Sequence, residues 1–244
     1  MLLAEGLCKS YGPRAVLHNL NLRVGAGEVV GIIGANGVGK TTLFRILCRL
    51  IPADSGSISI GVDGIGTQAP WSEIGYLPES RSLFPEVTVG RTLEFWSAMR
   101  GMSQRHAVQA RDLWLGKVGL LDRASHRVSS LSKGNLQKLQ LAACMLHTPR
   151  LLVLDEPFSG LDPANQVAVV ELVSHAARQG AAVVLSAHHL ELLQRFCGRI
   201  LVLRDAQLQP ALEQDLLLSP SIGPQACDRE ASSLLTSWER KACA

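Results

Sequence analysis

The stretch GANGVGKTT, residues 34–42, carries the residue types that bind a triphosphate. Gly34, four intervening residues and then Gly39, Lys40 and Thr41 match the phosphate-loop pattern. Glycines let successive backbone N–H groups point into one concavity, because no Cβ stands in the way of an anion. Lys40 can reach the β- and γ-phosphates, and the Thr41 hydroxyl suits a Mg²⁺ ligand. The loop therefore predicts that the chain binds a nucleoside triphosphate.

A pair of carboxylates, Asp155 and Glu156, follows the apolar run LLVL at residues 151–154. Such a run is typical of a buried strand, and ligands bind at the carboxyl ends of strands in open α/β sheets. Asp155 suits Mg²⁺, either directly or through water, and Glu156 could orient and deprotonate the water that attacks a γ-phosphate. The simpler alternative is a pair of solvated acids at the end of a strand.

The elements that must position these residues alternate between strands and helices. The buried run EVVGII, residues 28–33, leads into the loop, and residues 40–50 predict a helix whose first turn faces the phosphates. The same reasoning predicts strands at 54–61, 74–78, 151–157, 181–187 and 199–203 and helices at 133–147, 163–178 and 189–196. This alternation indicates an α/β fold with a mostly parallel sheet. Residues 1–10 and 15–24 alternate only in part and predict an antiparallel β subdomain at the N-terminus.

A helical pattern interrupts this alternation between Pro85 and about Leu131. Thr88 and Ser103 are candidate N-caps of two helices there. We therefore expect an all-helical insertion at about residues 86–131. We expect the main domain to span residues 1–204, and we treat residues 205–244, where the pattern decays, as an appendage of unknown role.

Composition bounds the possible partners and the compartment. The chain has 244 residues with a net charge of +3 and no lysine or arginine run, which argues against a nucleic-acid partner. Its six cysteines form no C-x-x-C pair, which favours reduced thiols and a cytoplasmic location. No apolar run approaches the roughly 20 residues that cross a bilayer. We therefore expect no direct membrane span and no signal peptide.

Three further motifs follow in a fixed order: LSKGN at 131–135, SGLD at 159–162 and SAHH at 186–189. With the phosphate loop and LLVLDEP, they resemble the ATP-binding subunit of an ABC transporter, from about Leu2 to Leu203. The resemblance implies a P-loop ATPase core with ATP and Mg²⁺ as cofactors. It also implies a second cassette, most simply another copy of the chain, paired head to tail so that each LSxG segment closes the partner's ATP. Transport would then run through a separate integral-membrane permease that holds the chain at the inner face of the cell membrane.

The resemblance assigns roles residue by residue. It implies nucleotide binding by Tyr11, Gly34, Asn36, Gly37, Gly39, Lys40, Thr41, Thr42, Ser132, Gly134 and Asp162, catalysis by Glu156 and His188, and Mg²⁺ binding by Thr41, Glu79 and Asp155. Tyr11 would stack on adenine, although an ordinary turn tyrosine remains the alternative. His188 would contact the γ-phosphate, and Asp162 would link the two sites of a dimer. The Ser132 hydroxyl and the helix start behind it suit the γ-phosphate held by the other subunit.

Three positions depart from the usual family pattern. Lys133 and Asn135 replace residues of LSGGQ, and Glu79 stands where most members have glutamine. A glutamate can still ligate Mg²⁺. The segment YLPE and the following residues resemble a branch that includes many drug, antibiotic and polysaccharide exporters, which favours export. Residues 79–100 would form the groove in which the permease docks.

Two other functions remain open at this stage. A soluble ABC ATPase could act on nucleic acid or ribosomes, but such proteins usually carry a long coiled-coil insertion or a second cassette, and neither is visible. A regulator could bind ATP and barely hydrolyse it. The presence of both Asp155 and Glu156 argues against that second alternative.

Overall fold

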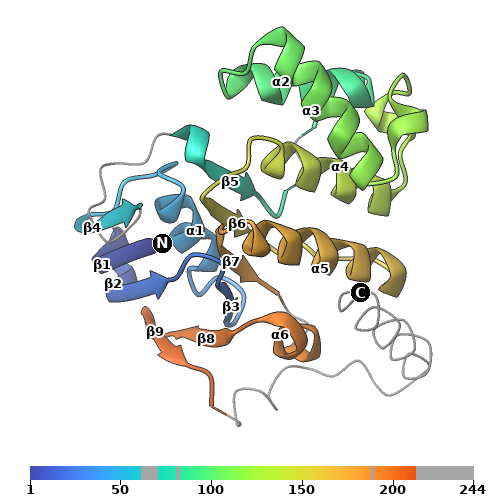
Figure 1. Cartoon of the computed structure of the whole chain (residues 1–244). Coiled ribbons are helices and arrows are strands. Elements are labelled where there is room, and N and C mark those ends of the chain that lie inside the picture. Colours follow the sequence, from blue (N-terminus) through green and yellow to red (C-terminus); the bar gives the residue numbers. More distant parts are fainter. Residues whose placement is uncertain (62–70, 81–82, 188–189, 213–244) are drawn as a thin grey trace.

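The computed structural model describes residues 1–61, 71–80, 83–187 and 190–212. Within these ranges the chain forms two β-sheets and the helices that pack on them (Figure 1). A mostly parallel sheet runs through the middle of the molecule. The N-terminal strands lie beside it, and two helices drawn in green form a lobe at the top of the view.

The central sheet has the strand order β5-β6-β7-β3-β8-β9. These strands are β5 (Ile74–Leu77), β6 (Leu151–Leu154), β7 (Ala182–Ser186), β3 (Val29–Ile33), β8 (Arg199–Arg204) and β9 (Gln207–Pro210). Neighbouring strands are parallel except β8 and β9, which are antiparallel. Because parallel strands end at the same edge, the segments that follow β3, β5, β6 and β7 meet there.

The inner strands β6, β7 and β3 are buried on both faces of the sheet, which explains why they are continuous apolar runs. Val153 and Val184 belong to the cluster that includes α1 (Lys40–Leu47) and the N-terminal strands. Leu152 and Leu185 belong to the second cluster, which includes the remaining helices. Alternate residues of each strand therefore pack on opposite layers, as the two-residue period of a strand requires.

A three-stranded antiparallel sheet has the order β2-β1-β4 and consists of β1 (Leu2–Tyr11), β2 (Arg14–Val24) and β4 (Ser55–Ile60). β1 and β2 form a hairpin in which Tyr11 pairs with Arg14. This sheet is the predicted antiparallel β subdomain, so the expected fold class is confirmed in both of its β parts.

The helical lobe contains α2 (Val89–Met99) and α3 (Gln104–Lys117). Both begin where their sequence caps predict, because Thr88 accepts a hydrogen bond from the backbone N–H of Arg91 and Ser103 accepts one from that of His106. The next helices are α4 (Lys133–Met145), α5 (Pro163–Arg178) and α6 (Leu190–Phe196). Ser132 caps α4 and Asp162 caps α5.

Several element boundaries differ from the sequence prediction, for example that of β6, which ends at Leu154 instead of residue 157, and one strand was missed. α1 ends at Leu47 instead of residue 50, because Arg49 adopts a positive φ of 56° that no helix tolerates. The prediction also missed β9, which has only one aliphatic residue, Leu208, and ends in a proline. β9 is joined to β8 by a tight turn in which Asp205 and Ala206 both have positive φ. Such turns usually carry Asn-Gly or Asp-Gly, so Asp-Ala gave no hairpin signal.

Candidate functional site

The phosphate loop, residues 34–42, joins the end of β3 to the start of α1. A Cβ on Gly34 would lie 2.7 Å from the backbone oxygen of Leu203. Gly39 has a φ of 120°, and a Cβ there would lie 2.5 Å from a methyl carbon of Val16. Both contacts are too short for any side chain, so the loop requires glycine at these two predicted positions.

The first turn of α1 has no side-chain cap, since its N-cap is Gly39. The helices α2, α3, α4 and α5 each have a Thr, Ser or Asp cap that accepts a hydrogen bond. The backbone N–H groups of the α1 start, together with its partial positive charge, therefore suit an anionic ligand.

Lys40 lies over the same loop. Its Nζ donates to the backbone oxygens of Gly34 at 2.7 Å and of Ala35 at 3.2 Å, and the residue is only 9% exposed. The ammonium is thus held at the concave side of the loop by carbonyl groups. Phosphate oxygens are stronger acceptors than these carbonyls for a charged donor.

Thr41 and Asp155 contact each other although 114 positions separate them in the chain. The Thr41 hydroxyl donates to Asp155 Oδ2 at 2.7 Å, and Asp155 is 2% exposed. The parallel strands β3, β7 and β6 explain this contact, because they bring the loop and the carboxylate to one edge of the sheet. The predicted meeting of the loop and the acidic strand is therefore seen in the geometry.

Ser186, at the end of β7, connects the two carboxylate residues and was not predicted as a site residue. Its hydroxyl donates to Asp155 Oδ1 at 2.8 Å and accepts from the backbone N–H of Glu156 at 2.9 Å. Ser186 is fully buried. The SAHH motif contained this signal, because a serine at the end of a strand beside β6 reaches the same edge.

Glu156 has an unusual backbone conformation, with a φ of 51°. A non-glycine residue in this region costs roughly 1 kcal/mol and commonly marks a functional position. Glu156 is 8% exposed, and the hydrogen bond from its N–H to Ser186 holds the strained backbone in place. The second predicted catalytic residue, His188, lies outside the described residues.

Glu79 follows β5 at the same edge of the sheet. β5 pairs with β6 so that Leu77 lies opposite Leu154, and the N–H of Asp155 donates to the oxygen of Leu77 at 2.8 Å. The chain therefore brings Glu79 to the edge where Asp155 lies, and its side chain is exposed.

The β1–β2 hairpin lies against the phosphate loop through Arg14. Its Nη2 donates to the oxygen of Gly37 at 3.0 Å, a contact that no sequence signal predicted. Tyr11, at the other side of the hairpin turn, is 52% exposed. An exposed ring next to the loop is available for stacking on a base. Asn36 is exposed on the loop.

A second group of predicted residues lies at the starts of α4 and α5. The Ser132 Oγ accepts from the N–H of Asn135 at 3.3 Å, and Asp162 Oδ1 accepts from the N–H of Asn165 at 2.8 Å. The hydrogen bonds from the backbone and the side chain of Asn165 lower the pKa of the Asp162 carboxyl. Ser132 and Asp162 are exposed, whereas Gly134 is buried.

The residues present fit ATP with Mg²⁺. A triphosphate suits the uncapped start of α1, the Lys40 ammonium and the glycines of the loop. Thr42 lies in the first turn of the same helix. The described residues contain no group of three or more His, Cys, Asp or Glu side chains that could hold a metal ion alone. Mg²⁺ typically binds one or two carboxylates together with substrate phosphates, so a Thr41–Asp155 pair suits it.

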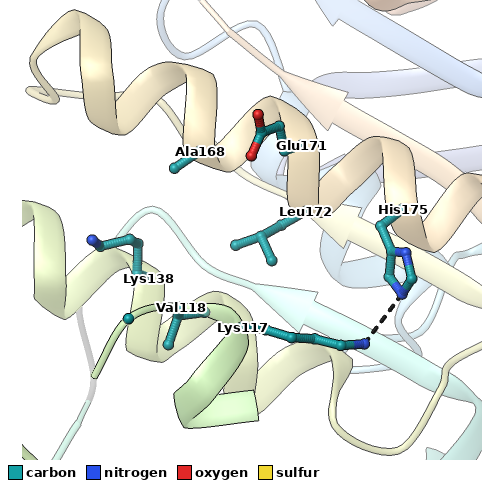
Figure 2. A pocket seen from close by; sticks show the side chains of 8 residues that line it. Lys117, Val118, Lys138, Ala168, Glu171, Leu172 and His175 are labelled. Atoms are coloured by element: carbon teal, nitrogen blue, oxygen red, sulfur yellow. Dashed lines mark hydrogen bonds between the residues drawn. The ribbon is translucent and has the colours of Figure 1, made fainter. Parts of the chain in front are cut away.

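Two other hollows lie among the described residues. One is a cleft of about 400 Å³ between the end of α3, α4 and α5. Lys117 Nζ lies 3.2 Å from His175 Nε2 there, and Figure 2 marks this contact with a dashed line. Burial and the nearby Lys117 and Arg178 lower the pKa of His175, so its neutral ring accepts from the lysine. None of the eight lining residues belongs to the phosphate site.

The second hollow is a groove of about 530 Å³ on the helical lobe, lined by Phe84, Val87, Arg91, Thr92, Glu94 and Phe95. We call it the Phe84–Phe95 groove. The two phenylalanine rings meet edge to face at 5.9 Å, and the residues are 56% and 44% exposed. Large contiguous apolar patches on a surface mark interaction sites, whereas single exposed apolar side chains are ordinary.

The fold and this site define a P-loop nucleoside triphosphatase. Comparison with known proteins gives the family: the model of the ABC transporter family matches residues 17–159, so the chain belongs to that family. Among curated relatives, the ABC transporter ATP-binding protein YhaQ of Bacillus subtilis is 36% identical over 84% of this chain and 68% of its own length. The linearmycin resistance ATP-binding protein LnrL of the same species is 31% identical over 85% of this chain and 68% of its own length.

The Nod factor export ATP-binding protein I of Rhizobium etli is 34% identical over 80% of this chain and 62% of its own length. A solved ATP-binding subunit of an ABC transporter superposes with a TM-score of 0.77 at 27% identity, over 97% of this chain and 99% of that one. A dimeric ATP-binding cassette with ADP and Pi bound superposes with a TM-score of 0.75 at 25% identity, over 86% and 97%. The predicted family, fold class and ATPase activity are thus confirmed.

Proposed function

We propose that this chain hydrolyses ATP in a head-to-tail pair of cassettes and thereby drives export through a separate integral-membrane permease. The ATPase domain would run from residue 1 to about residue 204, with the helical insertion at about 86–131 and β9 as an added edge strand. The observation that carries the proposal is the convergence of Lys40, Thr41, Asp155 and Glu156 at one sheet edge.

In this proposal the buried residues bind and orient the triphosphate. Lys40 would exchange its carbonyl acceptors for phosphate oxygens, and Tyr11 would stack on the base. Thr41 and Asp155, with Glu79 beside them, would hold Mg²⁺, which when bound neutralises charge on the phosphates. Glu156 would accept a proton from the attacking water, and Ser186 keeps its backbone in position. His188 remains a proposed γ-phosphate contact.

The exposed residues would act on a partner. The Ser132 Oγ accepts a hydrogen bond from its own helix, so its O–H is left to donate to a phosphate held by the second cassette. Asp162 would face the same interface. The dimeric solved relative with ADP and Pi supports this pairing. A second copy of the chain is the simplest partner.

The permease would dock at the Phe84–Phe95 groove. Its apolar rings, flanked by Arg91 and Glu94, suit an amphipathic helix of a membrane protein. No helix among the described residues is long and apolar enough to cross a bilayer by itself. The chain would therefore meet the membrane through this partner, at the inner face of the cell membrane. The names of the resistance and export relatives support the outward direction of transport.

The test is copurification. If an integral-membrane protein is encoded beside the gene, a tagged chain coexpressed with it should retain that protein in detergent. Phe95→Glu should release the permease and leave ATP binding unchanged. A matched control is Leu113→Glu, because Leu113 is also exposed in the helical lobe, at 58%, but lies outside the groove. Copurification of nucleic acid or ribosomes in place of a membrane protein would support the soluble alternative and overturn the proposal.

A further inference from the structure

The start of α4 rests on the SGLD loop, residues 159–162, of the same chain. A Cβ built on Gly160 would lie 1.6 Å from Lys133 Nζ and 2.6 Å from its Cε. The lysine that departs from the family pattern therefore lies across Gly160. Since it is the end of a flexible side chain, it could move away at little cost.

A second contact between the same segments is more rigid. A Cβ on the buried Gly134 would lie 2.5 Å from Nδ2 of Asn165, 2.7 Å from its Cγ and 3.0 Å from its Oδ1. The flat amide of Asn165 thus lies directly on Gly134. Asp162 fixes this amide, because Asn165 Nδ2 donates to both carboxylate oxygens of Asp162, at 3.0 and 2.9 Å.

A third contact connects α4 to the catalytic segment. The buried side chain of Gln137 donates from Nε2 to the oxygen of Pro157 at 2.9 Å, one residue after Glu156. The signature segment, residues 131–135, is therefore attached through its helix to the strand end that carries the carboxylates.

We propose that Asn165 is a positioning residue for ATP-dependent pairing of the cassettes, an inference that rests on the proposed function. Asp162 holds the Asn165 amide, and the amide packs on Gly134. Gly134 is two residues after Ser132, so this contact fixes the position of the segment that carries Ser132. The signature segment and the SGLD loop then present themselves to the partner as one unit. Position 134 requires glycine because Asn165 occupies the space above it. This requirement is separate from any contact between Gly134 and phosphate.

A double-mutant cycle on this pair tests the proposal. All four proteins of the cycle carry Glu156→Gln. The cycle compares this parent with Gly134→Ala, Asn165→Ala and the double variant. The measurements are the dimer dissociation constant with ATP and Mg²⁺, from sedimentation velocity, and the ATP affinity of the dilute chain. Asn165→Ala leaves the backbone cap of α5 in place, because that bond uses Asp162 and the backbone N–H of residue 165. Gly116→Ala is the matched control, since a Cβ at Gly116 in α3 meets nothing within 4 Å.

We expect Gly134→Ala to weaken the dimer at least tenfold, with ATP affinity of the dilute chain unchanged. Adding Asn165→Ala to Gly134→Ala should tighten the dimer again by at least fivefold, because the methyl group added at position 134 then has room. If the two effects simply multiply, or if Gly134→Ala has no effect on pairing, Asn165 does not seat Gly134 and the inference fails alone. If the parent itself stays monomeric with ATP, the proposed function fails and the positioning role fails with it.

Asn165→Asp gives an independent test that does not depend on the folding of Gly134→Ala. It keeps the size of the side chain but replaces the two hydrogen bonds to Asp162 by repulsion between carboxylates. We expect weaker pairing and a lower maximal ATPase rate in the chain with Glu156 intact, and only a small fall in the unfolding midpoint, because the repulsion at this exposed site is screened by water and salt. Pairing as tight as that of the parent would overturn the proposal.

Discussion

The two halves of the proposed nucleotide site differ in how far their own chain completes them. At the sheet edge, Lys40, Asp155 and Glu156 are 9% exposed or less. Lys40 donates to two backbone oxygens of its own loop, and the hydrogen bonds of Asp155 and Glu156 reach Thr41 and Ser186 on other elements. At the starts of α4 and α5, Ser132 and Asp162 are exposed and make the local hydrogen bonds of helix caps.

This difference predicts which half would depend on a partner. Buried polar groups must be satisfied within the fold, so the sheet edge is organised before any ligand arrives. An exposed cap needs only its own helix, and its remaining hydrogen-bonding capacity faces outward. We therefore expect the buried half to bind ATP in a single chain and the exposed half to act only in a dimer.

Replacing Glu156 should have the largest effect on the buried half. Glu156→Gln keeps the size of the side chain but removes the proposed base, so turnover should fall roughly 100- to 10,000-fold while ATP still binds. Steady-state phosphate release measures this, and an ATP-dependent dimer should accumulate. Glu171→Gln, which removes an exposed acid on α5, is the control. Turnover at the normal rate in Glu156→Gln would exclude Glu156 as the base.

Replacing Lys40 should have the next largest effect. Lys40→Ala removes a charged donor from the loop, and ATP affinity should fall about 100-fold because charge-assisted hydrogen bonds contribute up to about 3 kcal/mol. Titration calorimetry with a dilute, monomeric chain measures the loss. Lys117→Ala, far along the chain in the cleft of Figure 2, should bind ATP normally. Equal affinity in the two variants would mean that the loop is not the triphosphate site.

The role of the exposed half can be tested with a substitution that keeps the N-cap of α4. Ser132→Asp keeps a good N-cap for α4, so stability should change by less than about 0.5 kcal/mol. The new carboxylate would face the partner's phosphates, and pairing should weaken roughly 30-fold or more. Ser103→Asp makes the same exchange at the cap of α3 and should leave pairing intact. If both variants pair equally well, Ser132 does not meet a triphosphate across an interface.

Much of this molecule could be predicted from its sequence because its signals are local. The glycine loop, the buried strand before Asp155 and the caps Thr88 and Ser103 are properties of short segments, and each lies where it was expected. The mostly parallel sheet followed from the alternation of strands and helices.

What could not be predicted depends on contacts between distant segments or on unusual backbone. Ser186 matters because β7 lies beside β6, and Arg14 because the hairpin lies beside the loop. The positive φ of Glu156 has no sequence signal, since glutamate rarely adopts it. Asn165 was ordinary in the sequence, and only the space above Gly134 shows its contact.

The central sheet, which carries the buried half of the proposed site, also allows a test in which the expected effect is smaller and depends on pH. His147 Nε2 donates to the oxygen of Ile74 at the start of β5, and burial, aided by Arg100, lowers the pKa of His147 to about 4. Between pH 6.5 and pH 4 the unfolded chain binds a proton that the folded chain does not. Stability from this residue is therefore complete above pH 6.5 and is lost as pH falls toward 4.

We expect the free energy of unfolding to fall by about 1 kcal/mol between pH 7.5 and pH 5 through His147, with its partial exposure taken into account. In His147→Gln this part of the pH dependence should disappear, because glutamine does not titrate there but can still donate to Ile74. Urea unfolding of the parent and the variant at the two pH values measures the difference. The same slope in both proteins would show that a group other than His147 causes the pH dependence.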